Sequence, residues 1–190
     1  MAQLSSLIPL VRERCGGVLE QMAKDHLGRA YQKFCYESRF LARTQEIEKG
    51  QSGELTIDAQ HIFVDVDFDV DFVLDANGQE LKSTTDYVVS STGNVTVLST
   101  TPKVRVFYHI APQVIIPNDP EADNTIINRW ADALADGAAS TLLKMPNTQW
   151  TDLSMSSYYK RLFTDGYRDA FRVAIEALDE QRPTQPRVFI

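Results

Sequence analysis

The chain has 190 residues, of which 43% are hydrophobic and 24% charged, and its formal net charge is −7. This composition is that of an ordinary globular protein, which excludes global disorder. The acidic balance argues against a protein that grips nucleic acid through its phosphates, because that task needs clustered cations. The length suits one domain, or one domain with an inserted piece.

The negative charge is concentrated in the middle of the chain. Residues 1–52 carry eight Lys/Arg and six Asp/Glu, a net of +2, whereas residues 53–119 carry three and ten, a net of −7. Residues 120–190 carry eight and ten, a net of −2. We therefore predict a separate acidic module over 53–119, which follows an N-terminal helical part over 1–52.

Two helical patterns occupy the N-terminal part. A short helix is predicted over 5–15, with Ser5 or Ser6 as its cap and Gly16-Gly17 as its end. A longer helix is predicted over 18–38, because apolar residues recur there at intervals of three and four. These residues are Leu19, Met22, Ala23, Leu27, Ala30, Tyr31 and Phe34.

From about Phe40 the hydrophobic period changes to two, which is typical of strands. Asn77-Gly78 is a strong hairpin signal. Because no long apolar helix interrupts residues 55–110, the sheet is expected to be mostly antiparallel. The predicted strands are 55–57, 61–74, 87–89, 94–98 and 103–110.

Two more helices are predicted over 120–182, where they form a long hairpin. The first begins near Asn118-Asp119-Pro120-Glu121, which offers a cap, a proline and an acid for the first turn. Met145-Pro146 ends this helix, because proline disfavours helix in the residue before it. Thr151 or Asp152 caps the second helix, which is expected to run to about Glu180.

The short connection between these two helices predicts that they pack antiparallel. Gly137 and Gly166, one in each helix, favour a close approach of the two backbones, since a mid-helix glycine otherwise costs about 1 kcal/mol against alanine. The predicted fold class is therefore α+β: a helical body of about four helices with an inserted, mostly antiparallel β module.

Few residues offer chemistry. Cys15 and Cys35 are too far apart for a C-x-x-C pair and are predicted to be free, buried thiols. The three histidines are not at metal-ligand spacing from one another or from a cysteine, and no phosphate-binding or nucleophile-elbow motif is present. The sequence predicts no enzyme, no cofactor and no metal site. It also predicts no signal peptide, no membrane span and no direct membrane binding.

The most unusual local pattern is a ladder of alternating aspartates, Asp65, Asp67, Asp69 and Asp71. On a strand these carboxylates share one face, with neighbours about 7 Å apart. A calcium loop does not fit, because the turning glycine and the bidentate acid are not in place. Two interpretations remain: a solvated face that protects a sheet edge, and an acidic surface along which DNA slides without sticking.

The C-terminal segment 183–190 is the second unusual pattern. Its prolines cannot continue the helix, and it ends on apolar side chains, whereas frayed termini are usually polar. An extended segment with apolar anchors suits a partner's groove; a frayed end is the alternative. The candidate docking residues are Pro183, Pro186, Arg187, Val188, Phe189 and Ile190.

Several stretches together resemble the head-to-tail adaptor (connector, or neck) proteins of tailed bacteriophages, of the tail tubular protein A type. They are LIPLVRERCGG at 7–17 with AYQKFC at 30–35, NGQEL at 77–81, WADALADGA at 130–138 with LLKMP at 142–146, and WTD at 150–152 with the aromatic residues after it. Their order carries the resemblance, because none of these stretches is a chemical motif. The aspartate ladder departs from the family, which does not require it.

The resemblance implies a structural protein of the virion neck or tail, made in the cytoplasm of the bacterial host. Such adaptors form a homo-oligomeric ring under the portal, usually of twelve copies, which extends the DNA channel. The implied partners are the portal protein, a downstream tail or nozzle protein, and double-stranded DNA as passing cargo. The resemblance also implies that 183–190 docks on the portal. For the aspartate ladder both orientations stay open, towards the DNA channel or towards the outside. The alternative function is an acidic metal- or partner-binding module without catalysis.

Overall fold

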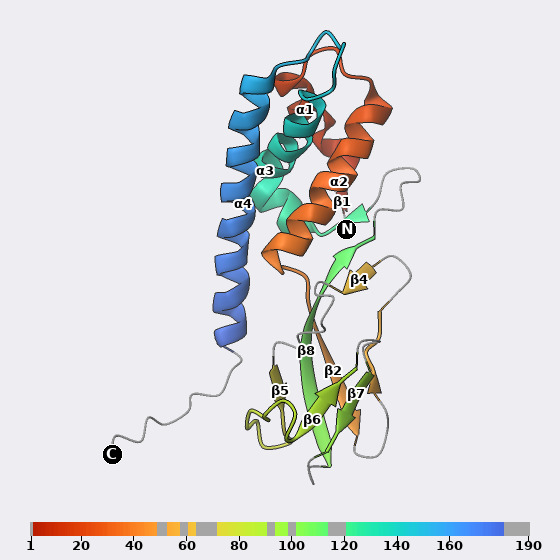
Figure 1. The fold of residues 1–190 in the computed structure, drawn as a ribbon, viewed down its shortest axis with the longest axis vertical. Helices are drawn as coiled ribbons and strands as arrows, with labels where there is room; N and C mark the ends of the chain where they lie inside the picture. Colours follow the sequence, from red (N-terminus) through yellow and green to blue (C-terminus); the bar gives the residue numbers. More distant parts are fainter. Residues whose placement is uncertain are drawn as a thin grey trace, which may run out of the picture. The chain divides into compact units, whose positions relative to one another are not determined.

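The computed structural model describes residues 2–48, 53–57, 61–63, 72–90, 94–98, 102–113 and 121–180. Contacts divide the chain into two compact units. The helical unit consists of Met1–Ser38 and Pro112–Phe171, and the β unit of Arg39–Ala111 and Arg172–Ile190. The described residues form four α-helices, with two small antiparallel sheets between α2 and α3 in the chain (Figure 1). The fold class is therefore α+β, as predicted.

The chain begins with a short strand and two consecutive helical segments. After β1 (Ala2–Gln3), the 3-10 helix η1 (Leu4–Leu7) leads directly into α1 (Ile8–Arg14), close to the predicted helix over 5–15. The predicted serine cap is wrong: the N-cap position of η1 is Gln3, which makes no side-chain cap bond, and the Ser6 hydroxyl instead donates to the Gln3 carbonyl at 2.8 Å.

Helix α2 (Glu20–Ser38) follows a turn in which Gly17 has a φ of +83°. Most of its predicted apolar stripe is buried, with Leu27 and Phe34 fully enclosed. Leu19 was predicted to belong to this stripe, but 66% of it is exposed. The reason is that α2 begins one residue later, so Leu19 precedes the helix and does not share its inward face.

Helix α3 (Asn124–Leu142) begins later than the sequence indicates. Its N-cap is Asp123, whose carboxylate accepts hydrogen bonds from the backbone N–H groups of Thr125 at 2.8 Å and Ile126 at 3.2 Å. The predicted start at 118–121 is wrong at Glu121, which lies in β9 (Glu121–Ala122) and pairs with β1; residues 114–120 lie outside the described ranges. The Asp123 side chain thus satisfies two of the N–H groups in the first turn of α3, as an N-cap residue does.

Helices α3 and α4 (Leu153–Asp179) pack antiparallel, as predicted. Three contacts show the antiparallel direction, because residue numbers along α4 increase while those of their partners on α3 decrease. The Ser156 hydroxyl donates to the Ser140 carbonyl at 2.6 Å, the Phe163 ring packs against Gly137, and the Trp130 indole donates to Asp169 at 3.3 Å. The predicted Asp152 cap is confirmed, with backbone bonds from Ser154 and Met155.

The β unit contains the two sheets, and every strand pairing described in it is antiparallel. In the larger sheet β8 is central, and in the smaller one β7 is central. The predicted strands at 87–89, 94–98 and 103–110 are confirmed, whereas 55–57 follows a strand without belonging to it. The strands are β2 (Ala42–Glu48), β3 (Gly53–Glu54), β4 (His61–Phe63), β5 (Phe72–Leu74), β6 (Tyr87–Val89), β7 (Asn94–Val97) and β8 (Lys103–Pro112).

The hairpin turn predicted at Asn77-Gly78 is present, with Gly78 at a φ of +78°. The Asp75 carboxylate stabilises it by accepting from the backbone N–H groups of Asn77 at 2.8 Å and Gln79 at 2.7 Å. The apolar core of the β unit includes Val73, Val95 and Val106, all fully buried.

Strand β2 belongs to the β unit, although the charge profile of the sequence places its residues in the N-terminal part. The profile divides the chain at residue 52, but β2 pairs with β8 over seven residues, from Ala42 opposite His109 to Glu48 opposite Lys103. This pairing places 39–48 in the β unit. Residues 172–180, at the end of α4, also belong to the β unit, where Leu178 packs on Leu74 and Phe107.

Candidate functional site

Both groups of residues that the sequence nominates as sites lie outside the described ranges. The aspartate ladder, Asp65, Asp67, Asp69 and Asp71, falls within 64–71. The candidate docking residues Pro183, Pro186, Arg187, Val188, Phe189 and Ile190 fall within 181–190. Their assignments to a DNA channel and to a portal therefore stay predictions.

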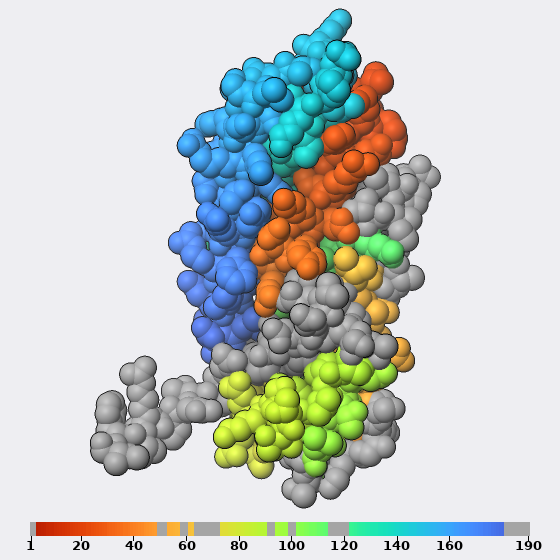
Figure 2. Space-filling model, in the orientation of Figure 1, coloured from red at the N-terminus to blue at the C-terminus, as the bar shows by residue number. Residues whose placement is uncertain are grey.

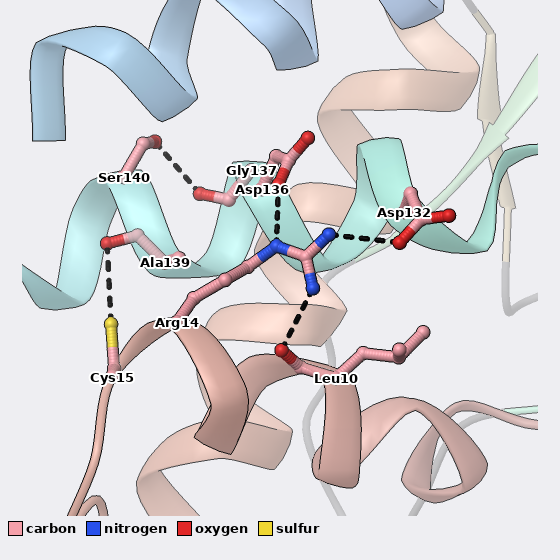
Figure 3. Close-up of polar contacts among 8 residues, drawn as sticks. All are labelled: Leu10, Arg14, Cys15, Asp132, Asp136, Gly137, Ala139 and Ser140. Carbon is pink, nitrogen blue, oxygen red and sulfur yellow. Dashed lines mark hydrogen bonds and ion pairs between the residues drawn. The ribbon is translucent and has the colours of Figure 1, made fainter. Parts of the chain in front are cut away.

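The strongest polar cluster in the helical unit is centred on Arg14, at the end of α1 (Figure 3). Its guanidinium spans the gap to α3, donating from Nε to Asp136 at 2.5 Å and from Nη2 to Asp132 at 2.8 Å. Nη1 donates back to the Leu10 carbonyl at 2.9 Å. Asp132 and Asp136 are four residues apart, which places both carboxylates on one side of α3.

The two halves of this cluster differ in exposure. Only 14% of the Arg14 side chain and 7% of the Asp136 side chain are exposed, whereas 81% of the Asp132 side chain is. Burial lowers the pKa of Arg14, but the bonds and charges of the two carboxylates outweigh it, so the pKa is raised. Burial raises the pKa of Asp136 and the Arg14 bond opposes that rise only in part. The arrangement therefore locks α1 to α3.

The two cysteines are free and buried, as predicted. The Cys15 thiol donates to the Ala139 carbonyl at 3.9 Å, and burial raises its pKa to about 11. Cys35 is fully buried, and burial raises the pKa of its thiol as well. Because the thiolate is the nucleophile and the metal ligand, both side chains are in the unreactive form at neutral pH.

The aromatic residues of the helical unit divide into a buried and an exposed group. Phe34, fully buried on α2, lies 5.7 Å from the Trp130 ring and 6.4 Å from the Phe163 ring, centroid to centroid. All three rings are buried and belong to the core of the helical unit. Tyr158 lies on the outside of α4, 45% exposed, next to Tyr159 at 5.4 Å.

Within the described ranges, no three His, Cys, Asp or Glu side chains are placed to hold a metal ion. None of the described helices combines the length and the apolar composition that a bilayer crossing requires.

Sequence reasoning missed the polar cluster of Arg14, Asp132 and Asp136. Residues 131–139 read as an alanine-rich packing surface, so Asp132 and Asp136 were not singled out. Their spacing of four residues on one helix was the available signal, although nothing in the sequence pairs them with Arg14.

Comparisons with known proteins do not assign the chain to a family. No protein-family model matches the chain, and no curated protein is significantly similar to it.

Proposed function

We propose that this chain is a structural adaptor of a tailed-phage virion, which forms a ring under the portal, extends the DNA channel and joins the head to the tail. The observation that carries the proposal is the order of the elements. Helices from both ends of the chain pack into one unit, and the two antiparallel sheets come between α2 and α3 in the order of the chain. The same order is what the resemblance to head-to-tail adaptors implies.

The way the helical unit uses its ionisable groups supports a scaffold. The hydrogen bond between Arg14 and Asp136 holds α1 against α3, and the bond from the Trp130 indole to Asp169 joins α3 to α4. Such bonds fix the relative positions of helices, which a ring subunit needs because its interfaces must close with constant geometry.

The charge of the chain supports a channel through which DNA moves. A net charge of −7 disfavours binding to phosphates, so double-stranded DNA is passing cargo in this account. The partners are the portal, the downstream tail or nozzle protein and further copies of the chain in a ring, usually of twelve copies. The location is the virion neck, and synthesis takes place in the host cytoplasm.

Removing residues 183–190 is expected to abolish binding to the portal and to leave the protein folded, because the truncation starts beyond the end of α4 at Asp179. The truncation removes every candidate anchor at once, and a few anchor residues carry most of the binding energy of an interface. The measurement is co-sedimentation of the full-length and truncated proteins with purified portal rings of the same phage.

Two point variants serve as controls for the truncation. Phe189→Ala removes an aromatic anchor and is expected to weaken portal binding, whereas Thr184→Ala removes no anchor and is expected to bind as the wild type does. Circular dichroism verifies that all variants are folded. A truncated protein that still co-sediments with the portal contradicts the docking role of the tail.

A further inference from the structure

The last turns of α4 have one side packed against the protein. Ala174 is 8% exposed, and Leu178, one helical turn later on the same side, is partly buried. Ile175, next to Ala174 in the chain, is instead 39% exposed, and Figure 2 shows α4, in blue, at the surface of the molecule. All three residues belong to the β unit, whose share of α4 begins at Arg172. This end of α4 therefore has a buried and an exposed side within that unit.

Leu178 covers two apolar side chains of the larger sheet. It packs on Leu74 of β5 and Phe107 of β8, which are only 5% and 3% exposed. These two residues share a face of the sheet, because Leu74 is in register with Arg105 and side chains two positions apart on a strand point the same way. Val106, the neighbour of Phe107, belongs to a separate core cluster on the other face. The contact with Leu178 therefore covers the second face of the sheet at this point.

This contact lies at the base of the C-terminal segment. Helix α4 ends at Asp179, directly after Leu178, and the first candidate docking residue is Pro183. From Leu178 to Pro183 the chain advances by five positions, a stretch that spans at most about 18 Å even when fully extended. Holding Leu178 on the sheet therefore keeps the start of the docking segment within that distance of a fixed point of the β unit.

We infer that Leu178 is a positioning residue for portal docking, because its contact with Leu74 and Phe107 fixes the point on the β unit from which segment 183–190 starts. The inference rests on the proposed function, in which that segment binds the portal. A segment whose base is already fixed loses less conformational freedom on binding, and this raises its affinity without any new contact. When the last turn of α4 is released, binding has to order that turn as well, so the affinity falls.

The test replaces Leu178 with asparagine, which is similar in size and carries no charge. An amide buried against Leu74 and Phe107 without a hydrogen-bond partner is unfavourable, so the end of α4 is expected to leave the sheet. Leu178→Asn is then expected to bind purified portal rings of the same phage at least about fivefold more weakly, because the docked form becomes a minor population. Ile175→Asn makes a matched change at an exposed position and is expected to bind as the wild type does. Sedimentation titrations measure both affinities.

Hydrogen–deuterium exchange connects the change in binding to the contact. In Leu178→Asn the backbone amides of 174–179 are expected to exchange faster than in the wild type, while those of β8 stay protected. In Ile175→Asn both sets are expected to exchange as in the wild type. Unchanged exchange in α4 of Leu178→Asn, or faster exchange with unchanged portal binding, overturns the inference. If β8 also loses protection, Leu178→Ala, which only shortens the side chain, is judged by the same two measurements.

A variant on the sheet separates positioning from a direct contact of Leu178 with the portal. Leu74→Ala removes part of the surface on which Leu178 packs, so it is also expected to weaken portal binding. Combined with Leu178→Asn, it is expected to add little further loss, because the two changes act on one contact. Normal portal binding by Leu74→Ala, beside weak binding by Leu178→Asn, would mean that Leu178 touches the portal itself, which overturns the positioning role.

The truncation of 183–190 separates the inference from the proposed function. If the truncated protein loses the portal and Leu178→Asn binds as the wild type does, the inference fails and the docking role of the segment stands. If the truncated protein still binds the portal, the docking role fails and the inference with it. A wild type that does not bind portal rings at all overturns the proposed function itself.

Discussion

Replacing Arg14 with alanine is expected to lower the free energy of unfolding by about 3 kcal/mol, since removing one partner of a buried ion pair leaves the other charge without compensation. The charge left without a partner is that of Asp136, whose side chain is only 7% exposed. In the wild type its carboxylate accepts the 2.5 Å hydrogen bond from Arg14. Urea unfolding followed by circular dichroism measures the loss.

The pH dependence of the Arg14→Ala loss identifies its cause. Burial already raises the pKa of Asp136, and the Arg14 bond lowers it; without Arg14 the pKa rises further. A carboxyl group whose pKa is raised in the folded state contributes stability at low pH that is lost as the pH rises. The loss caused by Arg14→Ala is therefore expected to shrink as the pH falls from 7 towards the ordinary carboxyl range.

A double variant provides the matched control for the ion pair. Arg14→Met/Asp136→Leu replaces both charges with apolar side chains, and such replacements of a buried pair are often close to neutral. It is expected to be more stable than Arg14→Ala alone. A loss that is independent of pH, or a double variant that is no better than the single one, would mean that Arg14 acts through packing alone.

Gly137→Ala is expected to destabilise the protein by about 1–3 kcal/mol, the usual cost of overpacking a core. An added Cβ would lie 2.7 Å from Cδ2 of Phe163 and 3.1 Å from Cβ of Ala30. In an open helix the same change stabilises by about 1 kcal/mol, because alanine has the higher helix propensity. The sign of the effect therefore reports the close packing of α3 between α2 and α4.

Gly28→Ala is the control for this sign, because Gly28 lies within α2 and an added Cβ would meet nothing within 4 Å. It is expected to raise the free energy of unfolding by about 1 kcal/mol. Thermal and urea unfolding of the two variants, measured side by side, give the comparison. Stabilisation by both substitutions would contradict the packing of Gly137 against Phe163.

Local patterns predicted much of the helical unit. The stripe from Leu27 to Phe34 repeats at the helical period, and the short connection before Asp152 leaves α3 and α4 no arrangement other than an antiparallel hairpin. Gly137 and Gly166 indicated the close approach, and Gly166 does lie against Ala133. Each of these signals lies within one element or between adjacent elements, where sequence spacing determines geometry.

The features that the sequence did not predict depend on residues far apart in the chain. Arg14 and Asp136 are separated by 122 positions, so no spacing rule pairs them. Helix α3 begins at Asn124 because Asp123 caps it, and the Asp123 N–H in turn donates to the Tyr31 hydroxyl at 2.9 Å. Local cap signals near Asn118 could not reveal that bond to α2. The ladder and the tail, which the sequence favoured as sites, lie outside the described residues.

Electron microscopy of the protein mixed with the portal of the same phage tests the central claim most directly. The account predicts a closed ring of this chain, coaxial with the portal, whose central opening continues the portal channel. The protein alone serves as the control, because a ring that forms only in the mixture identifies the portal as the template for assembly. A portal that carries no added density, at protein concentrations well above those of the portal, would contradict the account.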